Sequence, residues 1–168
     1  MTLSMYQAAV PVTARALQNL SAVLGKGAEH AKAKSISDET LLQTRLIADM
    51  LPLVKQIQIA TDMAKNGMAR LAGVEPLKFE DDETTVEQLQ ARVARAIEYI
   101  QSFTAEQIDG SEARPIQMKT RTGELNFTGQ DYLLNFVLPN LFFHSTAAYA
   151  ILRETGAEIG KWDFLGAA

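Results

Sequence analysis

Four long stretches of the chain carry apolar residues at intervals of three, four or seven positions, a spacing typical of amphipathic α-helices. The predicted helices cover residues 3–24, 38–71, 84–103 and 128–156. Helices with one apolar side bury that side against each other, because exposed apolar surface is unfavourable in water. The pattern therefore predicts an all-α fold that consists of a four-helix bundle.

Glycines and capping residues define the predicted ends of these helices. Gly25 and Gly27 are expected to stop the first helix, which places His30 in the loop that follows. Thr84 and Glu87 form a capping-box pattern at the start of the third helix. The signals at the ends of the fourth helix are Thr128 with Asp131, and Gly156.

A short segment between the third and fourth predicted helices has a different period. Ile116 and Met118 alternate with polar residues, and Leu125 and Phe127 do the same after a Thr-Gly pair. Alternation of this kind is typical of β-strands, so the segment is expected to form a small β-hairpin before the last helix. A two-stranded hairpin is only marginally stable alone, and this one is expected to pack on the helices.

The composition is that of one ordinary domain, predicted to span residues 1–168. Hydrophobic residues make up 47% and charged residues 21%, values typical of a globular protein rather than of a disordered chain. The net charge of -4 and the scatter of Lys and Arg provide no basic surface, so nucleic-acid binding is not expected. The absence of cysteine excludes disulfides, a thiolate nucleophile and zinc-thiolate sites.

The sequence carries no targeting or membrane-spanning signal. Its N-terminal stretch, "MTLSMYQAAVPVTAR", lacks a basic region followed by an unbroken apolar one, so no signal peptide is expected. No stretch reaches the roughly 18 uncharged apolar residues that a transmembrane helix needs. The simplest prediction is a cytoplasmic protein without membrane association.

Two segments outside the predicted helices carry distinctive residues. The stretch "EPLKFEDDE", residues 75–83, is an acidic linker whose charges are expected to be solvated. The C-terminal stretch "EIGKWDFLGAA", residues 158–168, holds the only tryptophan and further apolar residues. It is expected to fold back onto the helices.

Prolines fall inside three of the predicted helices, at Pro11, Pro52 and Pro139. A proline removes one backbone hydrogen bond and clashes with the carbonyl four residues earlier, so each predicts a kink. Two interpretations are open. The kinks curve the helices around the core, or those at Pro52 and Pro139 shape a site beside the polar residues near them.

His144 lies in the most apolar run of the chain, "LPNLFFHSTAAYAIL", with Asn140 one helical turn earlier on the same face. Helical bundles often place metal-binding or acid-base side chains at inward-facing positions on different helices. Asp49 interrupts the apolar side of the second predicted helix and is the candidate partner, since a buried carboxylate needs one. The alternative interpretation is structural: a hydrogen-bonded core histidine, and Arg45 paired with Asp49 four residues later.

His30 is the only other histidine, and it is expected in a loop. Loops carry many functional groups. If the loop closes over the end of the bundle, His144, Asp49 and His30 supply two imidazoles and a carboxylate, the ligand set of a facial-triad metal site. Sequence spacing leaves open whether the loop closes in this way.

Six segments together resemble one family, namely "SMYQAAVPV", "RLIADMLPLVKQI", "ATDMAKNGMARLAG", "FTGQDYLLNFVLPNLFFH", "TAAYAILR" and "GKWDFLG". The family is uncharacterised, a domain of unknown function in the DinB/YfiT-like helical-bundle superfamily. The likeness spans essentially the whole chain. It implies a DinB-like four-helix bundle of the up-down-down-up type that is commonly a homodimer.

The resemblance also implies a place for a site. Superfamily members often bind a divalent metal through three histidines, one on the second helix and two on the last, and some are thiol-dependent S-transferases or isomerases. This sequence departs from that pattern, because its second predicted helix has no histidine and its last has only His144. Asn140, one turn earlier, is a weak ligand for transition metals. The three-histidine site is therefore not carried over, and the resemblance implies only the place of a pocket, near His144, Asn140, Asp49 and Arg45, with His30 from its loop. The candidate zinc or nickel ligands remain the facial-triad set of His144, Asp49 and His30.

Two functions follow from these predictions. The first is a divalent-metal or small-ligand site near His144, related to the thiol-dependent S-transferases. The second is a non-catalytic homodimeric helical protein, active in ligand binding or in a stress response, with a degenerate metal site. The last predicted helix is apolar on almost all sides, and such a helix is either central or covered by a partner.

Overall fold

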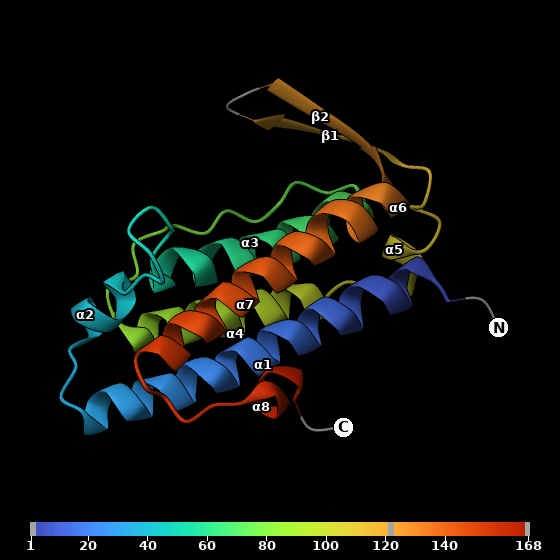
Figure 1. Ribbon diagram of the computed structural model, residues 1–168. Helices are drawn as coiled ribbons and strands as arrows, with labels where there is room; N and C mark the ends of the chain where they lie inside the picture. Colours follow the sequence, from blue (N-terminus) through green and yellow to red (C-terminus); the bar gives the residue numbers. More distant parts are fainter. Residues whose placement is uncertain (1–2, 121–122, 167–168) are drawn as a thin grey trace.

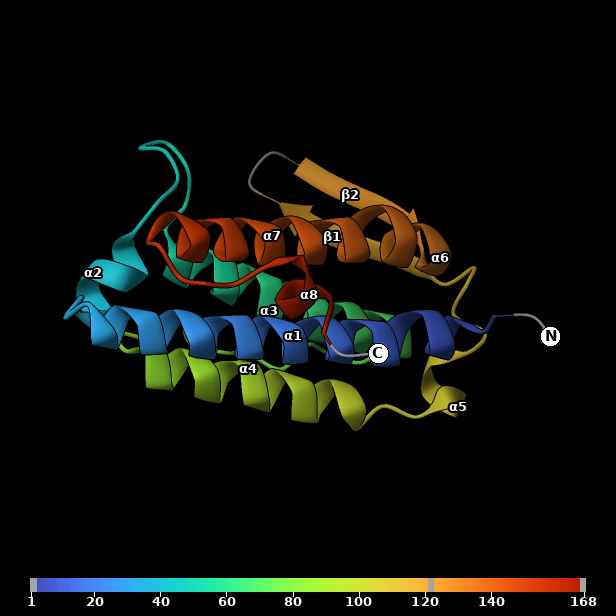
Figure 2. The ribbon, with the colours of Figure 1, turned by 60° about the horizontal axis from the view of Figure 1, so that its bottom comes forward.

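Four long helices make up most of the structure, which is a computed structural model that describes residues 3–120 and 123–166. They are α1 (Met5–Ala33), α3 (Leu53–Ala72), α4 (Val86–Gln101) and α7 (Leu138–Glu154). Both α1 and α3 pack along α4 and along α7, so the long helices lie side by side (Figures 1 and 2). Their apolar sides meet in one core, as the helical spacing predicts.

Shorter elements connect or cover the long helices. They are α2 (Asp38–Gln43), α5 (Ala105–Ile108), β1 (Pro115–Thr120), β2 (Gly123–Thr128), α6 (Gly129–Tyr132), the π-helix η1 (Leu133–Val137) and α8 (Lys161–Leu165). The two strands form one antiparallel hairpin before the last long helix, as predicted. The C-terminal segment folds back as predicted, because α8 packs on α1 (Figure 2). Within the described ranges, no helix combines the length and apolar character required to cross a membrane.

The first helix is longer than predicted. Instead of stopping at Gly25 and Gly27, α1 continues to Ala33, which places His30 in its last turn rather than in a loop. Gly27 is needed for helix packing: a Cβ atom at this position would lie 2.5 Å from a methyl carbon of Leu152 on α7. The glycine that suggested a helix end therefore allows α1 and α7 to approach closely.

The second predicted helix, residues 38–71, is interrupted. Residues 44–52 are not helical, and the N–H of Leu53 donates to the carbonyl of Thr44 across them at 3.0 Å. Pro52 is the N-cap of α3, so the kink predicted at this proline is wrong. A proline disfavours helical conformation in the residue before it and is well tolerated where a helix begins.

The predicted hairpin forms with the predicted alternation of residues. Ile116 lies opposite Phe127, and Met118 lies opposite Leu125. Ile116 is buried and Phe127 is half-buried against the core, so the hairpin packs on the helices as expected. The alternation of apolar and polar residues thus predicted both strands correctly.

Hydroxyl side chains cap the helices near the predicted positions. Thr85 rather than Thr84 caps α4, and its side chain accepts the N–H of Gln88 at 3.2 Å. Thr128 accepts the N–H of Asp131 at 3.3 Å, as predicted. The predicted glycine at the C-terminal end of the last helix is confirmed, since Gly156 follows α7 with a φ of 96°.

The last predicted helix is continuous along the chain but changes its hydrogen bonding. α6, η1 and α7 follow one another directly, and the N–H of Leu138 donates to the carbonyl of Leu133, five residues earlier. Pro139 lacks the N–H that an α-helix would offer to the carbonyl of Asn135. Where a kink was predicted at this proline, the structure has a π-helical turn immediately before it.

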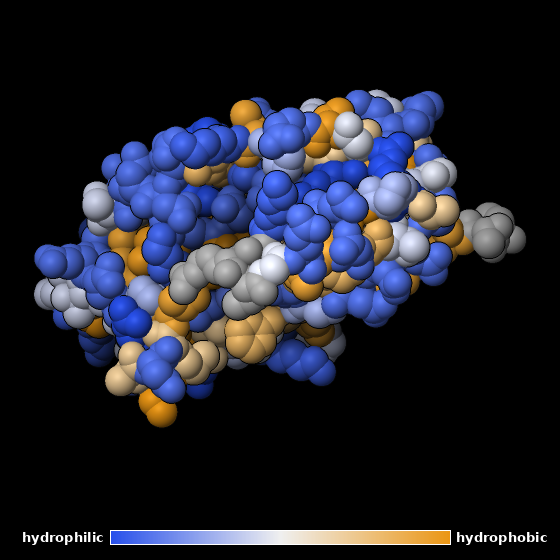
Figure 3. Space-filling view, turned by 90° about the horizontal axis from the view of Figure 1, so that it is seen from above, coloured by the Kyte–Doolittle hydropathy of each residue, from blue (hydrophilic) through white to orange (hydrophobic). Residues whose placement is uncertain are grey.

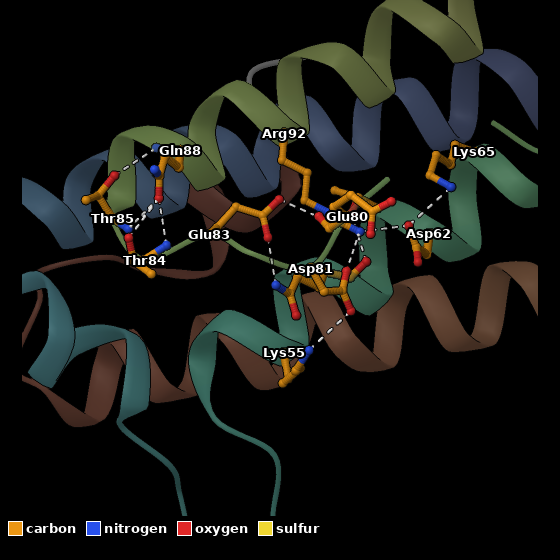
Figure 4. Close-up of polar contacts among 12 residues, drawn as sticks. Lys55, Asp62, Lys65, Glu80, Asp81, Glu83, Thr84, Thr85, Gln88 and Arg92 are labelled. Atoms are coloured by element: carbon orange, nitrogen blue, oxygen red, sulfur yellow. Dashed lines mark hydrogen bonds and ion pairs between the residues drawn. The ribbon is translucent and has the colours of Figure 1, made fainter. Parts of the chain in front are cut away.

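A buried guanidinium holds the linker between α3 and α4 in place (Figure 4). Arg92 on α4 is only 1% exposed. Its nitrogen atoms lie within 3.1 Å of oxygen atoms of Thr61, Asp62, Glu80, Asp81 and Glu83. Burial opposes its charge, but the hydrogen bond to Glu83 and the nearby carboxylates raise the pKa of Arg92. Two charges of the acidic linker, those of Asp81 and Glu83, therefore pair with a buried cation, whereas Glu75, Glu80 and Asp82 are exposed, as predicted.

Phe79 in the same linker packs between cationic side chains. The ring centroid lies 4.7 Å from Nζ of Lys65, and 5.3 Å and 4.3 Å from the guanidinium carbons of Arg92 and Arg95. Lys65 is itself buried and donates to the carbonyl of Leu77 at 2.7 Å. Cation–π contacts and hydrogen bonds thus fasten the linker to both helices.

Replacing Arg92 by Met should lower the free energy of unfolding by about 3 to 5 kcal/mol, because it leaves the largely buried Glu83 carboxylate without its cation and removes the donor to the buried Thr61 hydroxyl. Urea denaturation followed by circular dichroism measures this loss. Lys78→Met is the control, since Lys78 and Glu80 form an exposed ion pair, and no measurable change in stability is expected there. A loss of similar size in both variants would contradict the proposed role of Arg92.

Candidate functional site

His144 is half-buried on α7, where this helix packs along α3. Its Nδ1 lies 2.7 Å from Oε1 of Gln56 on α3. The Gln56 side chain is buried, and its amide nitrogen donates to the carbonyl of Leu51 at 3.0 Å. Because that nitrogen is already used, the amide oxygen faces His144, and Nδ1 of the imidazole must carry the proton and donate it.

The hydrogen bond to Gln56 decides which nitrogen of His144 is available. With the proton on Nδ1, the neutral ring has its lone pair on Nε2. Within the described part of the chain, Nε2 has no hydrogen-bond partner, and it is not among the buried atoms that lack one. Burial lowers the pKa of His144, which favours the neutral ring. The site therefore offers one oriented acceptor or base.

The aromatic residue next to His144 covers the imidazole only partly. The Phe143 ring meets the imidazole edge-on, with centroids 5.1 Å apart, and Phe143 is 61% exposed. Asn140 lies one turn earlier on α7, and its amide nitrogen donates to the carbonyl of Phe136 in the π-helical turn at 2.7 Å. Asn140 is thus near His144 along the helix, as predicted, but its amide is bonded to its own helix.

Asp49 and Arg45 are not in this cluster. Both are exposed in the non-helical segment 44–52. The Arg45 guanidinium donates to the carbonyl of Met50 at 2.8 Å, and among the described residues it forms no ion pair with Asp49. The helical spacing that suggested a buried Asp49 arose by coincidence, because the helix is interrupted there.

His30 lies at a different place on the molecule. Its Nε2 is 3.0 Å from the carbonyl oxygen of Thr155, just beyond the C-terminal end of α7. At a rise of about 1.5 Å per residue, the helix separates Thr155 from His144 by about 16 Å. Metal–nitrogen bonds are only about 2 Å long, so His30 and His144 do not share one metal ion in this arrangement.

The side chains near His144 do not fit a transition metal. They provide one imidazole and the amides of Gln56 and Asn140, and neutral amide oxygens are weak ligands for zinc or nickel. Across residues 3–120 and 123–166, no group of three or more His, Cys, Asp or Glu side chains has an arrangement that could hold a metal ion. The geometry supports a hydrogen-bonding site at His144.

Gln56 is the site residue that sequence reasoning missed. It lies 88 positions before its partner in the sequence, so local spacing gives no indication of the contact. One signal was available: Gln56 is a polar residue between Leu53 and Ile57, which are both fully buried on α3. A glutamine in such a run needs a polar partner, and the apolar last helix contains few residues that could serve.

Comparisons with known proteins agree with the helical fold and with the sequence resemblance. Residues 5–165 match the family described as "Domain of unknown function (DUF1993)". The chain is also similar to a protein in a crystal structure described as a DinB family member from Shewanella denitrificans. The two are 37% identical, the match covers 97% of this chain and 92% of that one, and the TM-score is 0.88. No curated protein matches the sequence significantly.

The stability of the protein should depend on pH through His144. Because burial lowers its pKa in the folded state, the unfolded state binds this proton more readily at acid pH. The contribution of His144 to the free energy of unfolding is constant above the unfolded-state pKa of about 6.5. It falls as the pH drops towards the folded-state pKa. Wild type should therefore lose stability relative to His144→Gln below about pH 6.5.

Urea denaturation of both proteins between about pH 5 and pH 8 measures this difference. The His30→Gln variant controls for the removal of an imidazole elsewhere on the molecule. A difference between wild type and His144→Gln that stays constant over the whole range would show that His144 is not disfavoured in its charged form.

Proposed function

The chain belongs to the DUF1993 family, and we propose that it is a metal-independent, non-catalytic binding protein with a degenerate metal site at His144. The observation that carries the proposal is the hydrogen bond of 2.7 Å from Nδ1 of His144 to Gln56. The bond identifies the α3 side chain beside His144 as a neutral amide. Because Nε2 of the ring stays open, it is the lack of further ligands, and not the bond itself, that disfavours a metal ion. A second histidine or a carboxylate would be needed there for a metal ion.

The proposed site binds a small molecule that donates a hydrogen bond to Nε2 of His144. A neutral imidazole held in one tautomer by a buried partner is an oriented acceptor. The same nitrogen can take up a proton, for example from a thiol, which is the chemistry this residue would contribute if the relation to the thiol-dependent S-transferases holds. Binding alone requires only the geometry described above.

We infer in addition that the long helices form an up-down-down-up bundle in a single cytoplasmic domain. The directions of the helices support this: α1 and α7 run one way along the bundle, and α3 and α4 run the other way (Figure 1). The DinB family member with the similar structure supports it as well.

The second candidate property is homodimerisation through α7. Phe142, Phe143 and Leu134 on this helix are 40%, 61% and 45% exposed. Ile47, in the non-helical segment 44–52, is 61% exposed. The face shown in Figure 3 is mostly hydrophilic, with apolar side chains gathered towards its lower left. An apolar surface of this kind is well suited to a symmetric contact with a second copy of the chain.

Metal analysis tests the main proposal. Protein purified without a histidine tag should contain no stoichiometric zinc or nickel, and a chelator should leave its melting temperature unchanged. The double variant Gln56→His, Asn140→His places two further imidazoles beside His144 and should gain zinc or nickel binding, which isothermal titration calorimetry measures. The matched control is the triple variant Gln56→His, Asn140→His, His144→Gln, which lacks the original imidazole. One equivalent of metal in the wild-type protein would refute the proposal.

Light scattering at micromolar concentration tests the dimer. Wild type is expected to be dimeric, and Phe143→Glu is expected to be monomeric because it places a charge within the apolar contact. Leu77→Glu provides the control, since Leu77 is 46% exposed beside Glu98 and Tyr99 of α4 rather than on α7. A monomeric wild-type protein would rule out the homodimer, and a dimeric Phe143→Glu variant would exclude this surface as the contact.

A further inference from the structure

A hollow of about 230 Å³ lies between α1, α7 and the C-terminal helix α8. Figure 2 shows α8 against α1, beside α7. The walls are mostly apolar: Val12 and Ala16 come from α1, Phe142 from α7, and Phe164 and Leu165 from α8. The hollow is distinct from the site at His144, because adjacent residues on a helix point about 100° apart and the neighbour of His144 lines it.

That neighbour is Ser145, one of three polar residues, with Arg15 and Asn19, among those that line the hollow. It is only 2% exposed, and its hydroxyl oxygen has no hydrogen-bond partner among the described residues. Buried hydroxyl groups are nearly always hydrogen-bonded, because removal from water is unfavourable when no partner replaces it. An unpaired hydroxyl that borders an apolar hollow indicates a partner supplied by a bound molecule.

The C-terminal segment that closes the hollow is firmly attached to α1. The side-chain amide of Asn19 donates to the carbonyl of Leu165 at 2.8 Å, and the Arg15 guanidinium approaches the same oxygen at 3.4 Å. Gly166 has a φ of 75°, and a Cβ atom there would lie 2.3 Å from Oδ1 of Asn19, so only glycine fits this contact. These contacts hold α8 in a defined position beside the hollow.

A residue of α7 also contacts Phe164, the aromatic residue of α8 that lines the hollow. Tyr149 meets the Phe164 ring edge-on, with centroids 5.9 Å apart. Asp163 pairs with Lys26 on α1 and accepts the N–H of Gly160 at 2.7 Å. Contacts to both long helices thus hold the aromatic ring of Phe164 over the hollow.

We propose that the hollow binds a small, flat aromatic molecule with one hydrogen-bond acceptor, to which the hydroxyl of Ser145 donates. Two phenylalanine rings on opposite elements provide aromatic faces and edges for such a molecule. An apolar cavity of about 150 Å³ holds benzene, so the larger hollow has room for a two-ring compound. The proposal is independent of the site at His144 and of whether that site binds metal.

Quinoline and naphthalene form a matched pair of probes, because they share their shape and only quinoline has an acceptor nitrogen. Titrations of the full-length protein, followed by NMR chemical shifts, should show binding of both, with quinoline the tighter. Ser145→Ala should weaken quinoline binding about fivefold or more and leave naphthalene binding within about twofold. Ala16→Leu fills the hollow and should abolish the binding of both probes.

Ser111→Ala is the control for Ser145→Ala, since Ser111 is also buried with an unpaired hydroxyl and does not line the hollow. It should leave the binding of both probes unchanged. Melting temperatures identify variants that fail to fold, and Ser145→Ala should melt at or above the wild-type temperature because it removes an unpaired hydroxyl. Failure of wild type to bind either probe, or equal effects of Ser145→Ala on both, would overturn the proposal.

Discussion

A guanidinium buried between two helices needs an acceptor for each of its N–H groups, and Arg92 obtains these from two separate parts of the chain. Thr61 and Asp62 belong to α3, whereas Asp81 and Glu83 belong to the linker that follows it. The linker cannot shift without removing acceptors from the Arg92 guanidinium, whose side chain is 1% exposed. The position of α3 against α4 is thereby defined, and the surface that α3 presents to α7 follows from it.

Both proposed sites depend on α7, because its neighbouring side chains face different helices. His144 faces α3 and bonds to Gln56, whereas Ser145 faces the hollow beside α1 and α8. The π-helical turn before Pro139 precedes both residues. One extra residue in a helical turn rotates everything after it by about 100° relative to what came before. The turn therefore affects which α7 side chains meet α3 and which meet α1.

The site at His144 was only partly predictable. His144 and Asn140 could be placed on one helix face because their separation of four positions decides this locally. Asp49 was misplaced, because the interruption before Pro52 breaks the helical period on which its burial was inferred. Gln56 went unrecognised because its partner lies 88 positions away, and local spacing does not identify a contact between such distant segments.

The sequence by itself determined the long helices and the hairpin, because periods of 3.6 and two follow from backbone geometry and the burial of apolar side chains. It did not determine the structural roles of Gly27 and Pro52. A glycine can end a helix or allow close packing, and a proline can kink a helix or stand at its start. Only the tertiary structure decided that Gly27 contacts Leu152, that the acidic linker surrounds Arg92, and that His144 meets an amide. These contacts join residues far apart in the chain, so they depend on how the helices pack.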